Sequence, residues 1–229
     1  MQKSDARLIY RAFIRFFLLV AAMLWVPLAV ILDVVVIGHG MPEDGVTEIS
    51  QEVLLLLSFG FFALLVFKRS QSRGFSILVA GFFLCMLIRE LDFMFDSIQH
   101  GFWKYIVSVI VLLSLLLAAI FRHSVVSPMA RATTSVAFHY ILTGLVIVLF
   151  FSRVFGTGTL WEMVLDDLSY TALIKNTVQE GTELLGYILI AWGALHYYRE
   201  QRTMKQMDQL PVMTDLEEES VTEAEPERR

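Results

Sequence analysis

Six long apolar stretches, separated by short polar segments, constrain the fold of this 229-residue chain more than any other feature of its sequence. A helix needs about 20 residues to cross roughly 30 Å of hydrocarbon. Hydrophobic residues make up 56% of the chain and charged residues only 18%, which is too apolar for an ordinary water-soluble domain. The sequence therefore predicts an all-α, polytopic membrane helix bundle, with spans near 16–38, 47–67, 75–97, 102–121, 132–152 and 176–198.

The distribution of Lys and Arg predicts how these spans are oriented, because basic residues are retained on the cytoplasmic side. An even number of spans with the bias seen here places both termini in the cytoplasm, in a plasma membrane such as the bacterial inner membrane. The net charge of −5 and the scattered basic residues indicate that the chain does not bind nucleic acid. The expected partner is the lipid bilayer. Fourteen of the 18 basic residues lie on the predicted cytoplasmic side: Lys3, Arg7, Arg11, Arg15, Lys68, Arg69, Arg73, Arg122, Arg131, Arg199, Arg202, Lys205, Arg228 and Arg229.

Two segments outside the spans have characters of their own. Residues 156–174 carry Trp161 and other apolar residues at helical spacing, with acids on the opposite side, and predict an amphipathic helix on the outer surface between the fifth and sixth spans. Residues 206–229 are acidic, contain two prolines and lack a core-forming period, which predicts a disordered cytoplasmic tail after a bundle of residues 1–205. A protein partner for this tail is an alternative to a purely solvated one.

Charged side chains gather at the outer ends of three spans. Only Arg89, Lys104, Arg153 and Lys175 offset 13 acidic residues on the outer side, which leaves that side at −9. In the second, third and sixth spans the polar residues follow helical spacing, so each set lines one helix face that cannot contact lipid. These sets are Glu48, Gln51 and Glu52; Arg89, Asp92, Asp96 and His100; and Asn176, Glu180, Glu183 and Tyr187.

Depth along the helices predicts that some of these charges meet. At 1.5 Å per residue, Glu52, Arg89 and Glu183 each lie ~24 Å from the basic residue at the cytoplasmic end of their own span. A charge at that depth is costly unless it is paired or hydrated. We therefore expect the three to converge, with Glu90, about 100° round the helix from Arg89, meeting a different neighbour. Arg153 lies ~33 Å from Arg131 and is expected near the same level.

The excess of carboxylates over guanidinium groups suggests a binding site for a positive charge. The leading hypothesis is a buried acidic site, open to the outer side, that binds a proton, metal ion or cationic solute for transport or sensing. A divalent cation suits the carboxylates, and Asp96 with His100 at i, i+4 is a candidate edge for a transition metal. The predicted ligand-binding residues are Glu48, Glu52, Arg89, Glu90, Asp92, Arg153, Glu180 and Glu183.

Other hypotheses remain open. A membrane enzyme acting on a lipid headgroup would use Glu52, Asp92 or Glu183 as general base and an arginine to hold phosphate. A structural or accessory subunit would use the charges only to fix helix register. Haem would need His139 and His196 as axial ligands, yet they lie at unequal depths, ~12 Å and ~4 Å from their span ends. Six spans without an internal repeat form a small unit for alternating access, so transport would require a homo-oligomer.

Overall fold

The computed structural model describes residues 2–38, 44–163 and 171–223, with side chains described for 5–38, 44–163 and 171–204. The described residues form helices joined by turns and contain no strand, as the sequence predicts. The α-helices are α1 (Gln2–Met23), α2 (Trp25–Ile31), α3 (Val46–Lys68), α4 (Arg73–Glu90), α5 (Asp92–Asp96), α6 (Trp103–Ile120), α7 (Val126–Ala132), α8 (Val136–Val146), α9 (Ser152–Phe155), α10 (Gly158–Glu162) and α11 (Thr171–Glu223). The short 3-10 and π segments are η1 (Leu32–Ile37), η2 (Ser70–Ser72), η3 (Arg122–Ser124) and η4 (Ile147–Phe151).

Five helical segments are long and apolar enough to cross a membrane: Asp5–Ile37, Val46–Lys68, Ser70–Glu90, Trp103–Ile120 and Val136–Phe155. They correspond to the first five predicted spans. The third ends at Glu90 rather than near residue 97, because the chain leaves the helix at Leu91 and starts the short helix α5. The first span is interrupted at Leu24, between α1 and α2. Pro27 explains the break, since it has no N–H to donate to the carbonyl of Met23.

The sixth predicted span lies inside α11, which is not among the five candidates. Glu180, Glu183 and His196 lower the hydropathy of this segment. Its side chains are nevertheless the most consistently buried in the molecule between Glu183 and Tyr198. A helix enclosed by other helices does not need a lipid-compatible surface, so its composition follows from its central position.

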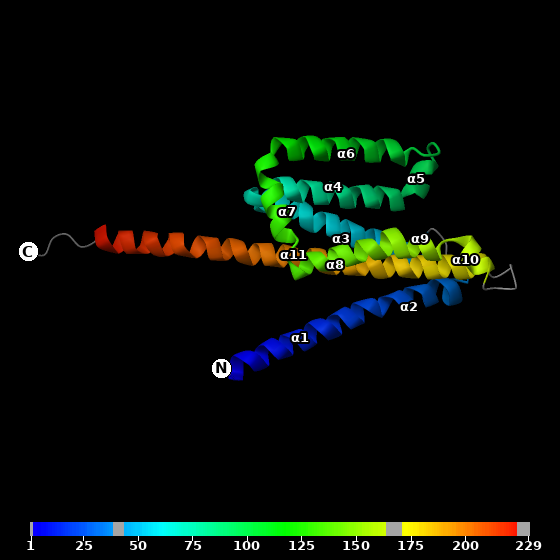
Figure 1. The fold of residues 1–229 in the computed structure, drawn as a ribbon, viewed down its shortest axis with the longest axis horizontal. Helices are drawn as coiled ribbons and strands as arrows, with labels where there is room; N and C mark the ends of the chain where they lie inside the picture. Colours follow the sequence, from blue (N-terminus) through cyan, green and yellow to red (C-terminus); the bar gives the residue numbers. More distant parts are fainter. Residues whose placement is uncertain (1, 39–43, 164–170, 224–229) are drawn as a thin grey trace, which may run out of the picture.

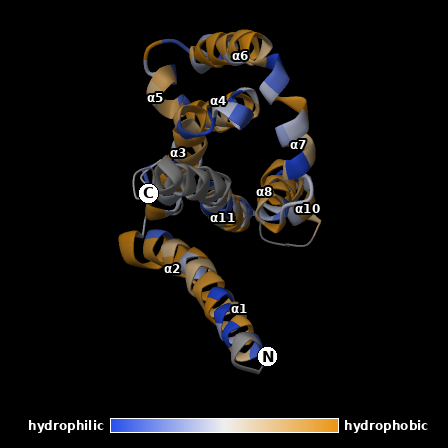
Figure 2. Ribbon diagram, turned by 90° about the vertical axis from the view of Figure 1, so that its left-hand side faces the viewer, coloured by the Kyte–Doolittle hydropathy of each residue, from blue (hydrophilic) through white to orange (hydrophobic). Residues whose placement is uncertain are grey.

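The helices form a bundle around α11. Figure 1 shows α3, α8, α9 and α10 beside it, with α4 and α6 stacked farther out and α1–α2 on the opposite side. α11 packs on α8 and α3, α3 packs on α4, and α4 packs on α6. Figure 2, coloured by hydropathy, shows the same order seen from the end of the bundle. The described parts of α1 and α11 begin and end on the same side of the bundle.

Glycines set the close approach of α8 to α11. A Cβ added at Gly193 would lie 2.6 Å from the carbonyl oxygen of Ala137, and one at Gly144 would lie 2.5 Å from the carbonyl oxygen of Gly186. Any side chain at these positions would force the two backbones apart. Small residues at such a crossing are typical of helix packing in membranes, where close van der Waals contact replaces the hydrophobic effect.

One end of the bundle gathers basic and aromatic residues, and we call it the basic end. Lys68 Nζ donates to Tyr198 Oη at 2.9 Å, joining α3 to α11. Arg73 lies over the Phe121 ring, with 5.2 Å between its guanidinium carbon and the ring centroid. Just inside this end, Phe62 stacks on Tyr197 with 5.5 Å between ring centroids, and both side chains are buried. The opposite end, where α3 begins, α4 finishes and α9 and α10 lie, is called the acidic end.

The predicted segments outside the spans are only partly described. Of the predicted amphipathic helix, α10 covers five residues, and Trp161 Nε1 donates to the carbonyl oxygen of Phe155 at 2.6 Å. Val164, Leu165, Leu168, Asp166 and Asp167 lie outside the described residues. Of the predicted tail, the backbone of residues 206–223 continues α11 as helix, and the boundary at residue 205 stays a prediction.

Candidate functional site

The end of α4 delivers two adjacent charges to the acidic end of the bundle. Arg89 and Glu90 are the last two residues of α4, and the chain turns at Leu91. Arg89 Nη2 contacts Glu90 Oε1, and the same carboxylate oxygen accepts a hydrogen bond from the Tyr187 hydroxyl of α11. Glu90 therefore reaches a neighbour of its own, as expected, but it also pairs with Arg89. Both side chains belong to one cluster.

Glu183 is the most buried carboxylate of this cluster, with only 2% of its side chain exposed. Arg153 of α9 places Nη2 3.0 Å from Glu183 Oε1, and Arg89 Nη2 lies 3.8 Å from Glu183 Oε2. Gln179, one turn earlier on α11, donates to Glu183 Oε1 at 3.2 Å. A charge buried this deeply requires such partners. Through them Glu183 links α4, α9 and α11.

A second buried contact joins α3 to α11 at Gln51. Its amide nitrogen donates to the Glu180 carbonyl oxygen at 3.2 Å and to Glu180 Oε2 at 3.1 Å. The Gln51 side chain is almost fully buried, at 1% exposure. A buried amide without a hydrogen-bond partner loses more free energy than a formed hydrogen bond contributes. This double contact therefore fixes the register of the two helices.

Between these groups lies a polar cavity of about 150 Å³, which we call the acidic cavity. Five carboxylates and two guanidinium groups line it, leaving three formal negative charges if all are ionised. Glu90, Glu180 and Glu183, which are held by the hydrogen bonds from Tyr187, Gln51 and Gln179, form part of its wall. The lining residues are Glu48, Arg89, Glu90, Asp92, Phe93, Arg153, Gln179, Glu180 and Glu183.

The structure thus brings together all the predicted ligand-binding residues except Glu52. Arg89 and Glu183 meet, whereas Glu52 is half-buried on α3 and does not line the acidic cavity. The neighbouring Gln51 occupies the face of α3 that is turned to α11. Adjacent residues of a helix point about 100° apart, so Glu52 is turned away when Gln51 faces α11.

Asp96 and His100 lie apart from this cavity. His100 Nδ1 is 2.9 Å from Asp96 Oδ2, but the histidine side chain is 97% exposed. Asp96 Oδ1 also accepts from the backbone N–H of Gly101 at 2.8 Å, where a φ of +79° closes the turn before α6. Among the described residues no three His, Cys, Asp or Glu side chains are grouped so that they could hold a metal ion.

The two histidines considered for haem lie on separate helices with different surroundings. His139 is exposed on α8. His196 is half-buried on α11, where Nδ1 lies 2.8 Å from the Trp192 carbonyl oxygen and the two rings are 4.6 Å apart by centroid.

One buried carboxylate went unassigned in the sequence analysis. Asp33, in η1, is fully buried and accepts hydrogen bonds from the backbone N–H groups of Val46 and Thr47, at 2.7 and 2.8 Å. These are the first two residues of α3, where helical N–H groups lack intrahelical partners and negative charge is favoured. Asp33 therefore caps α3 from another helix. In the sequence, the feature that indicates such a cap is an acid five residues before Gly38, at the end of an apolar span.

Five long apolar helices, with a cluster of paired charges enclosed among helices at one end, are the features of a multi-pass membrane protein. The chain matches no protein-family model, no curated protein and no solved structure.

Proposed function

We propose that this protein crosses the plasma membrane six times, with both termini in the cytoplasm, and that its acidic cavity binds a proton, metal ion or small cationic solute from the outer side, for transport or sensing. The observation that carries the proposal is the charge of the acidic cavity, with five carboxylates against two arginines. A positively charged ligand would offset the excess.

The ion pairs at the acidic cavity support a cation rather than an anion. Arg89 and Arg153, the two guanidinium groups of the lining, already contact Glu90 and Glu183. Glu180 has an amide, Gln51, as the partner of its carboxylate rather than a guanidinium group. An anion would compete with carboxylates for both arginines, whereas a cation would meet carboxylates from α3, α4 and α11.

The size of the acidic cavity suits a small hydrated ion. Its volume of about 150 Å³ is well above the ~10–15 Å³ that a single water molecule requires. A small cation could therefore keep part of its hydration shell, or an ammonium group of similar size could replace it.

The position of α11 supports the sixth crossing. Its segment between Glu180 and Tyr198 runs from the acidic end to the basic end alongside α3 and α8, which are both candidate spans. The concentration of Lys and Arg at the basic end favours the cytoplasm for that side.

Ligand-dependent thermal stabilisation tests the proposal, because a ligand that binds only the folded state raises its stability by mass action. We expect the Tm of the detergent-solubilised protein to rise with at least one of K⁺, Mg²⁺, Mn²⁺, Zn²⁺ or tetramethylammonium, or to depend on pH between 5 and 8. Glu180→Gln should weaken that response. Glu162→Gln is the matched control, since Glu162 is exposed at the same end and does not line the acidic cavity. A wild-type Tm that responds to no cation and no pH change would refute the proposal.

A structural role is the second candidate, because Glu183 is already satisfied by Arg153, Arg89 and Gln179. If the cluster only fixes helix register, Arg89→Met should destabilise the protein by a few kcal/mol through an unpaired buried carboxylate. Arg89→Met combined with Glu90→Gln and Glu183→Gln should then recover much of the loss. Recovery together with an absent cation response would favour the structural role.

A further inference from the structure

A large apolar groove lies between the first span and the rest of the bundle. It has a volume of about 470 Å³, within the range of about 300–1,000 Å³ typical of small-molecule sites. Its walls are the first span (α1 and α2), α3 and α11, which contribute Ala22 and Trp25, Val53 and Leu57, and Ala191 and Leu195, among others. Ser50 is a hydroxyl residue of the lining, and its Oγ accepts from Trp25 Nε1 at 2.9 Å and donates to the Val46 carbonyl oxygen at 2.6 Å. The groove therefore suits an apolar chain.

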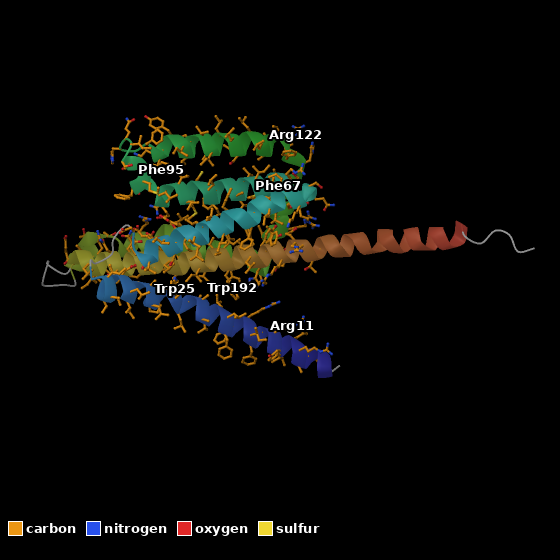
Figure 3. The ribbon with its side chains drawn as sticks, turned by 180° about the vertical axis from the view of Figure 1, so that it is seen from behind. Arg11, Trp25, Phe67, Phe95, Arg122 and Trp192 are labelled. Carbon is orange, nitrogen blue, oxygen red and sulfur yellow. The ribbon has the colours of Figure 1, made fainter. Side chains whose placement is uncertain are left out.

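Beyond the groove, towards the basic end, α1 diverges from the rest of the bundle (Figure 1). Every residue of α1 from 5 to 18 is exposed, including those on the side of the groove, and partial burial begins at Leu19. Figure 3 shows Trp25 and Trp192 between the first span and α11, and Arg11 farther along α1, on the side towards α11. α1 therefore diverges from α11 beyond the apolar groove.

On both α1 and α11, arginines lie on the same helix face as groove-lining residues, in the direction of the basic end. On α1, Arg15 lies seven residues and Arg11 eleven residues before the groove-lining Ala22. Steps of seven and of eleven residues each bring a helix back to within about 20° of its starting direction, so these residues share a face. The arginines lie ~10 and ~16 Å from Ala22, towards the basic end.

The same spacing recurs on α11. Arg199 lies seven residues after Trp192, and Arg202 lies seven after Leu195, so both follow the groove-lining face of this helix. All four arginines are exposed, and Arg202 has its guanidinium 5.9 Å from the Tyr198 ring centroid. Two helices thus bring four positive charges to the side of the apolar groove that is turned towards the basic end.

We propose that this groove binds one anionic phospholipid, with an acyl chain between α1, α3 and α11 and its phosphate between the arginines of α1 and α11. The four arginines favour a lipid over a second copy of the chain. In a parallel dimer, the basic end of the second copy would lie against these arginines and be repelled by them. Arginine suits the phosphate because its planar donors can bind two oxygens at once. The proposal does not depend on the acidic cavity.

Native mass spectrometry of the full-length protein in detergent tests the site, using dioleoyl phosphatidylglycerol and dioleoyl phosphatidylcholine as probes. We expect one phosphatidylglycerol per protomer to be retained, with markedly weaker retention of phosphatidylcholine. Arg199→Gln with Arg202→Gln should weaken phosphatidylglycerol binding roughly tenfold or more, since each basic residue near a membrane surface contributes roughly fivefold. Arg122→Gln with Arg131→Gln is the control, because it removes the same charge from the basic end away from the groove.

A second variant tests the groove rather than the charge. Ala191→Phe fills part of the groove and should reduce retention of phosphatidylglycerol while all four arginines remain. Equal retention of the two lipids, or equal loss in the control pair, would overturn the proposal in favour of a non-specific surface attraction. A dimer that Ala191→Phe converts to monomer would overturn it in favour of a second copy as the occupant.

Discussion

Single residues decide which helix faces meet at the acidic end. Counting residues from each basic span end predicted a common level for Arg89 and Glu183, and the two side chains are in contact. Depth can be read from sequence because the rise of a helix is constant. Rotation is harder to read, since one residue changes it by about 100°, and Gln51 rather than Glu52 faces α11. Asp33 lay beyond such reasoning because its partners are 13 and 14 residues away across a loop.

The Asp33 carboxylate gives a test at this scale. Asp33→Ala would leave the N–H groups of Val46 and Thr47 unpaired in a buried place, and we expect the free energy of unfolding to fall by about 2 kcal/mol. Asp33→Asn keeps one acceptor oxygen and should cost less. Tm in detergent measures both. Asp44→Ala is the control, because Asp44 is exposed two residues before α3. An equal loss of Tm in Asp33→Ala and the control would contradict the capping role.

Whole helices are predicted from apolar length, including the one that other helices enclose. The five candidate spans correspond to the first five predicted spans, to within a few residues at most ends. The sixth, predicted at 176–198, lies within α11 and is less apolar than the five, because burial among other helices relaxes the demand for apolar residues. Its composition is decided by tertiary contacts that a hydropathy window does not contain.

The crossing of α8 and α11 gives a test at the scale of elements. Gly193→Ala would place a methyl group against the Ala137 carbonyl, so we expect a loss of about 1–3 kcal/mol in stability from overpacking. Gly60→Ala is a matched control, since an added Cβ there meets nothing within 4 Å. Helix propensity alone should stabilise the control by up to about 1 kcal/mol. Unfolding of both variants in the same detergent would measure the difference, and equal stability would argue against close packing.

At the scale of the whole molecule, the testable property is topology. In a Cys85→Ser background, single cysteines at Asp44 and Thr157 should react with a membrane-impermeant maleimide in intact cells. Cysteines at Gln71 and Thr203 should react only after lysis. The expectation follows from an even number of crossings and the positive charge of the basic end. Labelling of Thr203→Cys in intact cells would remove the sixth crossing.

The continuity of α11 has a mechanical consequence. One helix contacts the acidic cavity through Glu183, passes along the bundle and leaves it at the basic end, with its backbone helical to Glu223. From Glu183 to Glu223 such a rod is ~60 Å long. If it pivots near the cavity as a straight lever, a tilt of about 5° moves its far end by about 5 Å. The same tilt would move Gly193, ten residues along, by about 1 Å against α8, so a small rearrangement around Glu183 and its neighbours would be magnified about fourfold in the segment that emerges from the bundle.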